Sequence, residues 1–114
     1  MAVLFELQQT TEEGIDILTI MGEVDLSNCE LFQEKLSLFL AADKLMLLRL
    51  ETHYFDIEAL KSFVSVNRQA KKMRCRLIVV ANRMGYRILS VLKNGVEEIP
   101  TYQNIEEAFL ALKQ

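Results

Sequence analysis

Two segments near the start of the chain consist mainly of apolar residues. Residues 3–7 and 15–21 are rich in β-branched, aromatic and leucine side chains, interrupted by single polar residues, which is typical of β-strands. The polar stretch at residues 10–14 lies between them and ends in a glycine, which favours a turn. The pattern therefore predicts that the fold opens with an antiparallel hairpin.

A helical period of apolar residues replaces this strand pattern after residue 26. Ser27 and Glu30 have the spacing of a capping box, in which the serine hydroxyl accepts a hydrogen bond from the Glu30 amide. Apolar residues then recur every three or four positions up to about Ala42, at Leu31, Phe32, Leu36, Phe39 and Leu40. We expect a helix that begins at Ser27 and packs its apolar stripe against a sheet.

The rest of the chain alternates apolar runs with helical patterns. The apolar runs, which predict strands, occupy residues 44–50, 76–81 and 97–101. The helical patterns occupy residues 57–73, 83–93 and 104–112. Asp56 precedes the first of these helices as an N-cap, and Asn104 precedes the last with Glu107 at the third helical position.

The predicted order of elements is ββαβαβαβα, which is typical of the α/β fold class. Strands that alternate with helices are joined by right-handed crossovers and lie parallel. We therefore expect a mixed, mostly parallel sheet with one antiparallel edge from the N-terminal hairpin, in a single domain over residues 1–114. Loops at the carboxyl ends of the strands, where such sheets bind ligands and partners, are expected at residues 22–25, 52–56 and 82–85.

Composition narrows the class of protein. The residues are 51% hydrophobic and 25% charged, which is the balance of a globular chain. No apolar run approaches the roughly 18 residues that span a bilayer, and the N-terminus lacks the basic and apolar segments of a signal peptide. We therefore expect no membrane insertion and a cytoplasmic location, in which Cys29 and Cys75 remain reduced thiols.

Charge is unevenly distributed along the chain. Residues 1–60 contain 12 acidic and 3 basic side chains, whereas residues 61–95 contain 9 basic side chains and no acidic one. Such a division gives the folded domain an electric field that could orient a charged partner as it approaches. Alternatively, the basic residues lie on the solvated faces of a helix and a strand and have no such role. The basic segment at residues 68–76 has no aromatic residue on which bases would stack, so we expect no direct nucleic-acid binding.

The sequence contains no recognisable motif for catalysis or cofactor binding. His53 is the single histidine and accompanies no nucleophile motif, so we interpret it as a loop residue rather than a catalytic base. One histidine and two distant cysteines do not make a metal site, and neither glycine-rich phosphate-binding motif occurs. The sequence therefore predicts a protein that binds another protein and has no enzymatic activity, metal or cofactor.

Two short motifs remain, and they are the most informative part of the chain. They read Gly22-Glu23-Val24-Asp25 and Phe55-Asp56-Ile57-Glu58-Ala59-Leu60. Together with the order of elements over nearly the whole chain, they resemble the STAS domain family, in particular bacterial anti-sigma factor antagonists. The resemblance implies partner switching in transcription regulation: an antagonist docks on an anti-sigma factor kinase and frees a sigma factor. Docking ends when the kinase phosphorylates the second serine of the family motif D-S-S-G-L.

The second motif departs from the family pattern. Asp56 and Leu60 match the family's aspartate and leucine. Ile57, Glu58 and Ala59 replace the first serine, the phosphorylated serine and the glycine. Glu58 cannot be phosphorylated, so it either imitates one state of the switch permanently or marks the loss of the switch. The dipole of the predicted helix favours the negative charge of Glu58 by roughly 0.3–1 kcal/mol. The resemblance implies that the docking site comprises Asp25, Asp56, Ile57, Glu58, Ala59 and Leu60.

Three functions fit these observations. The first is a divergent antagonist, for which Thr52 and Ser62 are the hydroxyls nearest to the lost serine, although Ser62 falls inside a predicted helix. The second is a STAS scaffold or regulatory subunit of a transporter or sensory complex without a kinase. The third is a sensor that binds a nucleotide or another small molecule near residues 82–87. The identity of the partner and the oligomeric state are left open by the sequence.

Overall fold

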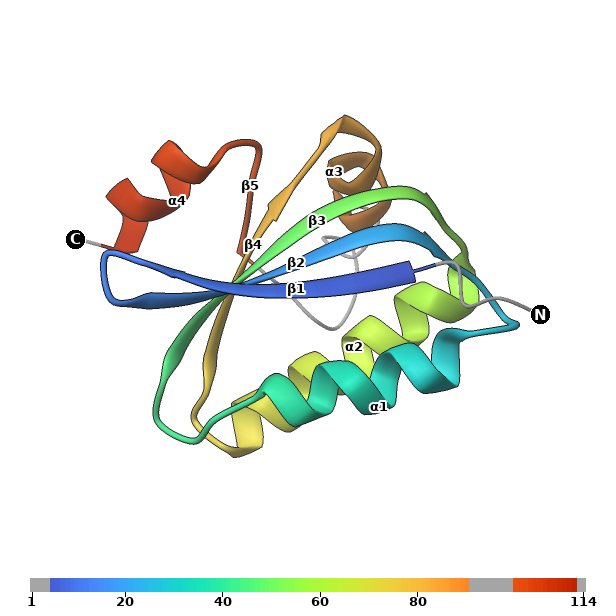
Figure 1. Cartoon of the computed structure of the whole chain (residues 1–114), viewed down its shortest axis with the longest axis horizontal. Coiled ribbons are helices and arrows are strands. Elements are labelled where there is room, and N and C mark those ends of the chain that lie inside the picture. The colour runs from blue at the N-terminus through green and yellow to red at the C-terminus, as the bar shows by residue number, and fades with distance from the viewer. Residues whose placement is uncertain (1–4, 91–99, 113–114) are drawn as a thin grey trace.

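The computed structural model describes residues 5–90 and 100–112. Figure 1 shows the helices and strands, which are β1 (Phe5–Glu12), β2 (Ile15–Val24), α1 (Cys29–Phe39), β3 (Leu45–Phe55), α2 (Ile57–Lys72), β4 (Arg76–Ala81), α3 (Arg83–Ser90), β5 (Thr101–Tyr102) and α4 (Ile105–Leu112). This order confirms the predicted ββαβαβαβα succession and the α/β fold class.

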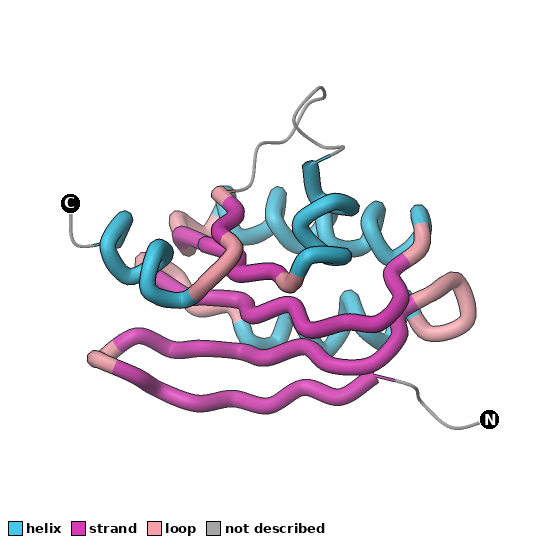
Figure 2. The backbone as a smooth tube through the Cα atoms, turned by 90° about the horizontal axis from the view of Figure 1, so that it is seen from above, coloured by secondary structure: helices cyan, strands magenta, loops and turns pink. Residues whose placement is uncertain are grey.

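The five strands form one sheet in their order along the chain, β1-β2-β3-β4-β5 (Figure 2). β1 is antiparallel to β2, and the pairs β2–β3, β3–β4 and β4–β5 are parallel. The predicted mixed sheet with one antiparallel edge is therefore confirmed. Because β2, β3 and β4 run in the same direction, the loops that follow them meet at one edge of the sheet.

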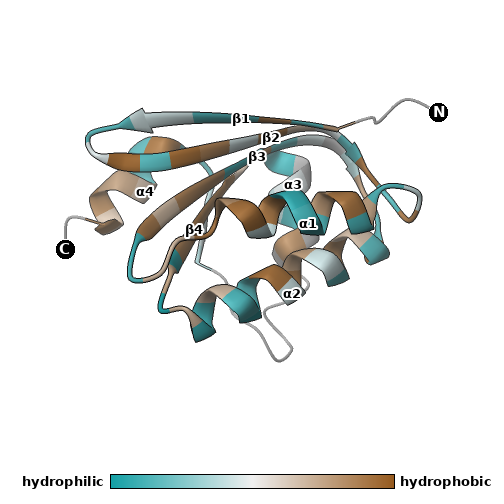
Figure 3. Cartoon of the chain, turned by 60° about the horizontal axis from the view of Figure 1, so that its bottom comes forward, coloured by the Kyte–Doolittle hydropathy of each residue, from teal (hydrophilic) through white to brown (hydrophobic). Residues whose placement is uncertain are grey.

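Alternate residues of the central strands belong to two hydrophobic clusters on opposite faces of the sheet. Leu48 and Leu50 of β3 lie in the larger cluster, whereas Leu47 lies in the smaller one. Figures 1 and 3 show α1 and α2 side by side over the face of the larger cluster, with α4 over the other face. Leu89 of α3 also joins the larger cluster. The main core therefore lies between the sheet and the pair of helices α1 and α2.

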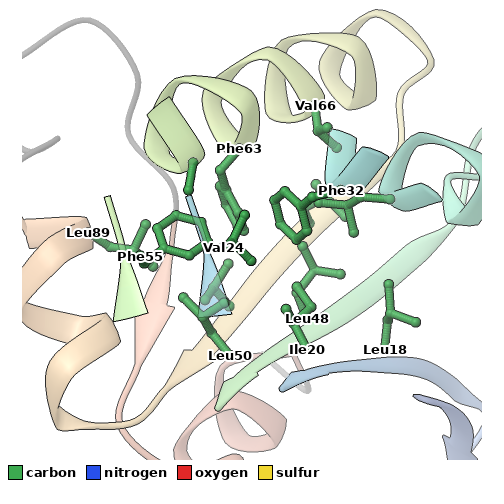
Figure 4. Close-up of a cluster of buried hydrophobic side chains, with 14 of the residues drawn as sticks. Leu18, Ile20, Val24, Phe32, Leu48, Leu50, Phe55, Phe63, Val66 and Leu89 are labelled. Atoms are coloured by element: carbon green, nitrogen blue, oxygen red, sulfur yellow. The ribbon is translucent and has the colours of Figure 1, made fainter. Parts of the chain in front are cut away.

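Four phenylalanine rings run through the larger cluster in a chain of edge-to-face contacts. Phe32 of α1 lies between Phe5 and Phe55, at centroid distances of 5.7 and 5.8 Å. Phe55 also contacts Phe63 of α2, at 6.2 Å (Figure 4). Each such pair adds about 0.5–1.5 kcal/mol beyond the burial of its area. The rings therefore anchor the last residue of β3, directly before Asp56.

The hairpin turn is shorter than predicted. β1 continues through residues 10–12, so that only Glu13 and Gly14 connect it to β2. Their φ angles of 52° and 77° are both positive, as a two-residue type I′ turn requires. The assignment of residues 10–12 to the turn was wrong because these polar residues are exposed on an edge strand and lack an apolar alternation. Residues 3 and 4 of the predicted first strand lie outside the described residues.

The capping-box prediction at the start of α1 is wrong. The N-cap residue is Asn28. The Ser27 hydroxyl donates a hydrogen bond to the Asp25 carboxylate and does not accept one from the Glu30 amide. A charged carboxylate forms a stronger hydrogen bond than a neutral group, so the serine side chain turns toward it. The helix also ends before the predicted Ala42.

β2 and β3 are longer than predicted. Residues 22–24 extend β2 and residues 52–55 extend β3, although the sequence pattern assigns both segments to loops. The first loop therefore begins only at Asp25, and the second is Asp56 alone. The error arises because these strand ends carry polar residues, which sequence periodicity does not distinguish from a loop.

The C-terminal half agrees with the sequence pattern at β4, at the start of α3 and at the N-cap of α4. β4 has the predicted bounds, and α3 begins at the predicted residue. The Asn104 side chain accepts a hydrogen bond from the Glu107 amide at 2.9 Å, which confirms the predicted N-cap of α4. β5 begins only at Thr101, so Pro100 of the predicted strand 97–101 is not part of it, and residues 97–99 lie outside the described residues. The same holds for residues 91–93 of the helix predicted to follow β4.

Candidate functional site

The carboxyl ends of β2 and β3 bring the two sequence motifs together. The Asp56 backbone amide donates a hydrogen bond to the Val24 carbonyl at 3.3 Å. The Leu26 amide donates to the Asp56 carboxylate at 3.0 Å. A shallow hollow of about 390 Å³ is lined by Asp25, Leu26, Ser27, Tyr54 and Asp56. The structure therefore places two of the predicted site residues, Asp25 and Asp56, at one hollow.

Asp56 connects the two loops through both oxygens of its side chain. Oδ1 accepts a hydrogen bond from the Ala59 amide at 2.9 Å and caps the N-terminus of α2, as predicted. Oδ2 accepts the hydrogen bond of the Leu26 amide from the loop after β2. The side chain therefore fixes that loop against the start of α2.

Replacing Asp56 by alanine is expected to lower the free energy of unfolding by about 2 kcal/mol. The substitution removes the N-cap and the hydrogen bond from Leu26, each worth about 1 kcal/mol. Asp56→Asn keeps an oxygen for the cap but turns an amide toward the Leu26 N–H, so we expect about half of that loss. Urea unfolding followed by circular dichroism measures both variants. Equal losses in the two variants would contradict the double role of this side chain.

Asp25 orders the loop on the other side of the hollow. Its carboxylate accepts hydrogen bonds from the Ser27 hydroxyl and, at 2.8 Å, from the Ser27 amide. These bonds, the one from the hydroxyl foremost, hold the pKa of Asp25 below its usual value, so the side chain is ionised at neutral pH. The Asn28 side chain accepts from the Asp25 amide at 2.9 Å and donates to the Glu23 carbonyl at 3.0 Å. Short polar side chains thus hold this loop in one conformation.

Glu58 occupies the second position of α2, in the first turn of the helix. Its carboxylate lies 3.3 Å from Nζ of Lys61, and the two side chains are 36% and 69% exposed. An exposed ion pair of this kind contributes only about 0.3–0.5 kcal/mol. The negative charge of Glu58 is therefore directed along the helix toward a lysine, with little consequence for stability.

The other predicted site residues on α2 differ in exposure. Ile57 is 62% exposed, whereas Ala59 and Leu60 are 0% and 6% exposed and belong to the core. Ala59 and Leu60 therefore hold the helix against the sheet. Ile57 presents an apolar side chain to the solvent at the first position of α2.

Two exposed apolar residues outside the predicted set lie at the same end of the fold. Leu26 and Tyr54, which are 69% and 51% exposed, line the hollow beside Asp56, and Ile57 follows Asp56 directly. We call Leu26, Tyr54 and Ile57 the apolar patch. Exposed large apolar side chains that gather at one place are typical of interaction sites rather than of solvated surface.

A β-bulge in β3 explains the exposure of Tyr54. Gly22 of β2, with a φ of 94°, pairs with Thr52. The next residue of β2, Glu23, pairs with Tyr54, so β3 contains one extra residue at this point. The extra residue interrupts the alternation of side chains along β3. As a result, Thr52 and Phe55 are buried and Tyr54 faces solvent. A strict period of two would place Tyr54 on the buried side with Thr52, so no signal in the sequence pattern marks it.

Thr52 and Ser62, the threonine and the serine nearest to Glu58 in the sequence, both lie inside the protein. Thr52 is 1% exposed and Ser62 is 7% exposed. A kinase would have to unfold the end of β3 or the first turns of α2 to reach either oxygen. Their burial therefore argues against phosphorylation at these two positions.

A second cavity, of about 400 Å³, lies at the carboxyl end of β4. The Asn82 side chain accepts a hydrogen bond from the Gly85 amide at 2.8 Å and caps α3, so residues 83–85 belong to the predicted helix and only Asn82 of the expected loop 82–85 lies outside it. The cavity is lined by Ala81, Arg83, Tyr86, Arg87 and Gln103. Its two guanidinium groups give it a positive charge.

Among residues 5–90 and 100–112, no cluster of histidine, cysteine, aspartate and glutamate side chains is arranged to hold a metal ion. In the same part of the chain, no helix combines the length and the apolar character that crossing a membrane requires. Cys29 and Cys75 are buried free thiols. The described features of the main site are thus two ordered loops, two carboxylates and an exposed apolar patch.

Comparisons with known proteins assign the chain to a family. The family model of the STAS domain matches residues 6–108. The fold is similar to the crystal structure of an anti-sigma factor antagonist from Mycobacterium paratuberculosis, with a TM-score of 0.73 and 14% sequence identity, and the alignment covers 96% of this chain and 95% of that chain. No functionally curated protein matches the chain in sequence. The chain belongs to the STAS domain family.

Proposed function

We propose that this protein is a non-enzymatic regulator that docks on another protein, in the manner of an anti-sigma factor antagonist. The observation that carries the proposal is the apolar patch of Leu26, Tyr54 and Ile57, which comes from three segments of the chain. The patch lies where Asp25 and Asp56 line a hollow. Apolar anchors with a charged rim are the usual composition of a protein–protein interface.

The partner that we propose is an anti-sigma factor with the fold of a serine kinase, whose capture frees a sigma factor. The similarity of the fold to an anti-sigma factor antagonist supports a partner of this class. Glu58 stands where the family's phosphorylated serine would stand, so phosphorylation at this position does not end docking. The charge of Glu58, balanced in part by Lys61, is compatible with a permanently docked or differently regulated protein.

Glu58→Ser is expected to convert position 58 into a substrate of the partner. The hydroxyl would lie in the first, exposed turn of α2, where the helix dipole favours an added phosphate. Mass spectrometry after incubation with the purified partner and ATP measures the modification, and Glu58→Ala is the control. A Glu58→Ser protein that binds the partner and stays unmodified would show that the partner is no kinase. It would favour the second candidate, a STAS scaffold or regulatory subunit of a transporter or sensory complex.

The cavity beside α3 supports another candidate function, that of a sensor for a nucleotide or another small anion. Arg83 and Arg87 follow one another at the i, i+4 spacing, which places both guanidinium groups on one face of the helix. Titration with ATP or GTP, followed through the amide NMR signals of residues 82–87, tests this candidate. A saturable change would support it, and a titration without such a change removes it.

A further inference from the structure

We propose that Ser27 is a phosphorylation site and that a phosphate on its hydroxyl ends docking. Ser27 would thus take over the role of the family's phosphorylated serine, whose position Glu58 occupies. The proposal rests on the proposed function, since it concerns the regulation of the same surface. Ser27 is exposed and lines the hollow together with Leu26, Tyr54 and Asp56. It therefore lies within the proposed interface, on the loop that faces the start of α2.

Accessibility distinguishes Ser27 from Thr52 and Ser62, the threonine and the serine nearest to Glu58 in the sequence. Thr52 and Ser62 are 1% and 7% exposed and belong to a strand and a helix, whereas Ser27 lies in the loop between β2 and α1. A kinase docked on the apolar patch would reach the Ser27 oxygen without unfolding any element. Because Leu26 is its immediate neighbour, docking on the patch would bring the kinase to this residue.

The hydrogen bond of the Ser27 hydroxyl prepares it for phosphoryl transfer. The hydroxyl proton of Ser27 is directed to Oδ1 of Asp25. The lone pairs of the Ser27 oxygen therefore point away from Asp25 and can attack a phosphorus atom. In the transfer, the bond between the γ-phosphorus of ATP and the ADP oxygen breaks, and a bond from that phosphorus to Oγ forms. The hydroxyl proton is released, and the products are phosphoserine and ADP. Asp25 is a positioning residue in this step.

A phosphate on Ser27 would change the surface in two ways. It adds nearly two negative charges beside the carboxylates of Asp25 and Asp56 and next to the apolar patch. It also replaces the hydrogen bond from the hydroxyl to Asp25 with a repulsion between two anions, one residue from the Leu26 amide that bonds to Asp56. The fold itself would tolerate the phosphate, because Ser27 directly precedes the N-cap of α1, where the helix dipole favours negative charge.

Mass spectrometry of the protein purified from its source cells tests for the modification. The expected result is the mass of one phosphoryl group on a fraction of the molecules, with fragment ions that locate it at Ser27, and no such group on a Ser27→Ala variant expressed in the same cells. Phosphate on a different residue, or none on Ser27 in the molecules that are free of partner, would overturn the proposal.

Affinity measurements on charge variants test the consequence of the modification. Ser27→Glu is expected to weaken partner binding at least about tenfold more than Ser27→Ala does, because the alanine variant removes the same hydroxyl without adding a charge. Ser65→Glu is the matched control, because Ser65 is exposed on α2 about two turns beyond Ile57. Unchanged affinity of Ser27→Glu would overturn the regulation at Ser27. If Ile57→Asp still abolished binding in the same assay, the proposed docking function would stand without it.

Discussion

Truncation of Phe32 to alanine is expected to lower the free energy of unfolding by about 3–5 kcal/mol. Phe32 is 0% exposed, and its ring makes edge-to-face contacts with the rings of Phe5 and Phe55. The variant loses both contacts and leaves a cavity between α1 and the sheet that the neighbouring side chains fill only in part. Since a domain of this size is typically stable by about 5–15 kcal/mol, one substitution would remove a large share of the total.

Phe39→Ala is the matched control for this prediction. Phe39 lies on the same helix, but it is only partly buried and packs against the margin of the larger cluster. We therefore expect Phe39→Ala to lose at most about half as much free energy of unfolding as Phe32→Ala. Urea unfolding gives both values. The Phe32→Ala protein should also show shifted amide NMR signals at residues 54–57, because the aromatic chain anchors Phe55 next to the site. An equal loss for the two variants would contradict the central position of Phe32 in the core.

Ile57→Asp is expected to weaken binding to the protein partner at least about 100-fold without destabilising the fold. Ile57 is an exposed member of the apolar patch, and central apolar residues of an interface contribute about 2 kcal/mol or more each. The introduced carboxylate would also have to lose its hydration when the partner docks. The first position of α2 favours an acidic residue, so the free energy of unfolding should stay within about 0.5 kcal/mol of the original value.

Leu38→Asp separates the effect of the patch from that of surface charge. Leu38 is 82% exposed on α1 and lies outside the patch. Isothermal titration calorimetry with the purified partner should show less than about a threefold change for this variant. If Leu38→Asp and Ile57→Asp weakened binding equally, affinity would depend on the overall charge of the protein and not on the patch.

The order of elements could be predicted from the sequence because its signals are local. β4 is buried on both faces for most of its length, so it reads as a continuous apolar run, and its bounds at residues 76–81 follow directly. Asp56 and Asn104 each precede a clear helical pattern, and both accept the hydrogen bond that defines an N-cap. These features depend on a few neighbouring residues and not on the rest of the fold.

The surface of the site could not be predicted in the same way, because it depends on pairing between distant segments. Tyr54 is exposed because a bulge in β3 shifts the register against β2. Ser27 bonds to Asp25 instead of capping α1 because the loop after β2 brings the carboxylate to it. Ala59 and Leu60 belong to the sequence motif, yet the phase of α2 directs both into the core. A motif therefore locates the site, while the strand register and helix phase decide which of its residues face a partner.

Docking through the apolar patch is tested most directly by an NMR footprint, in which the isotopically labelled protein is saturated with the unlabelled partner. We expect the largest losses of signal at Leu26, Tyr54 and Ile57, with smaller changes around Asp25. Largest changes at the cavity lined by Arg83 and Arg87, with the signals of the apolar patch unaltered, would contradict docking at this end of the fold.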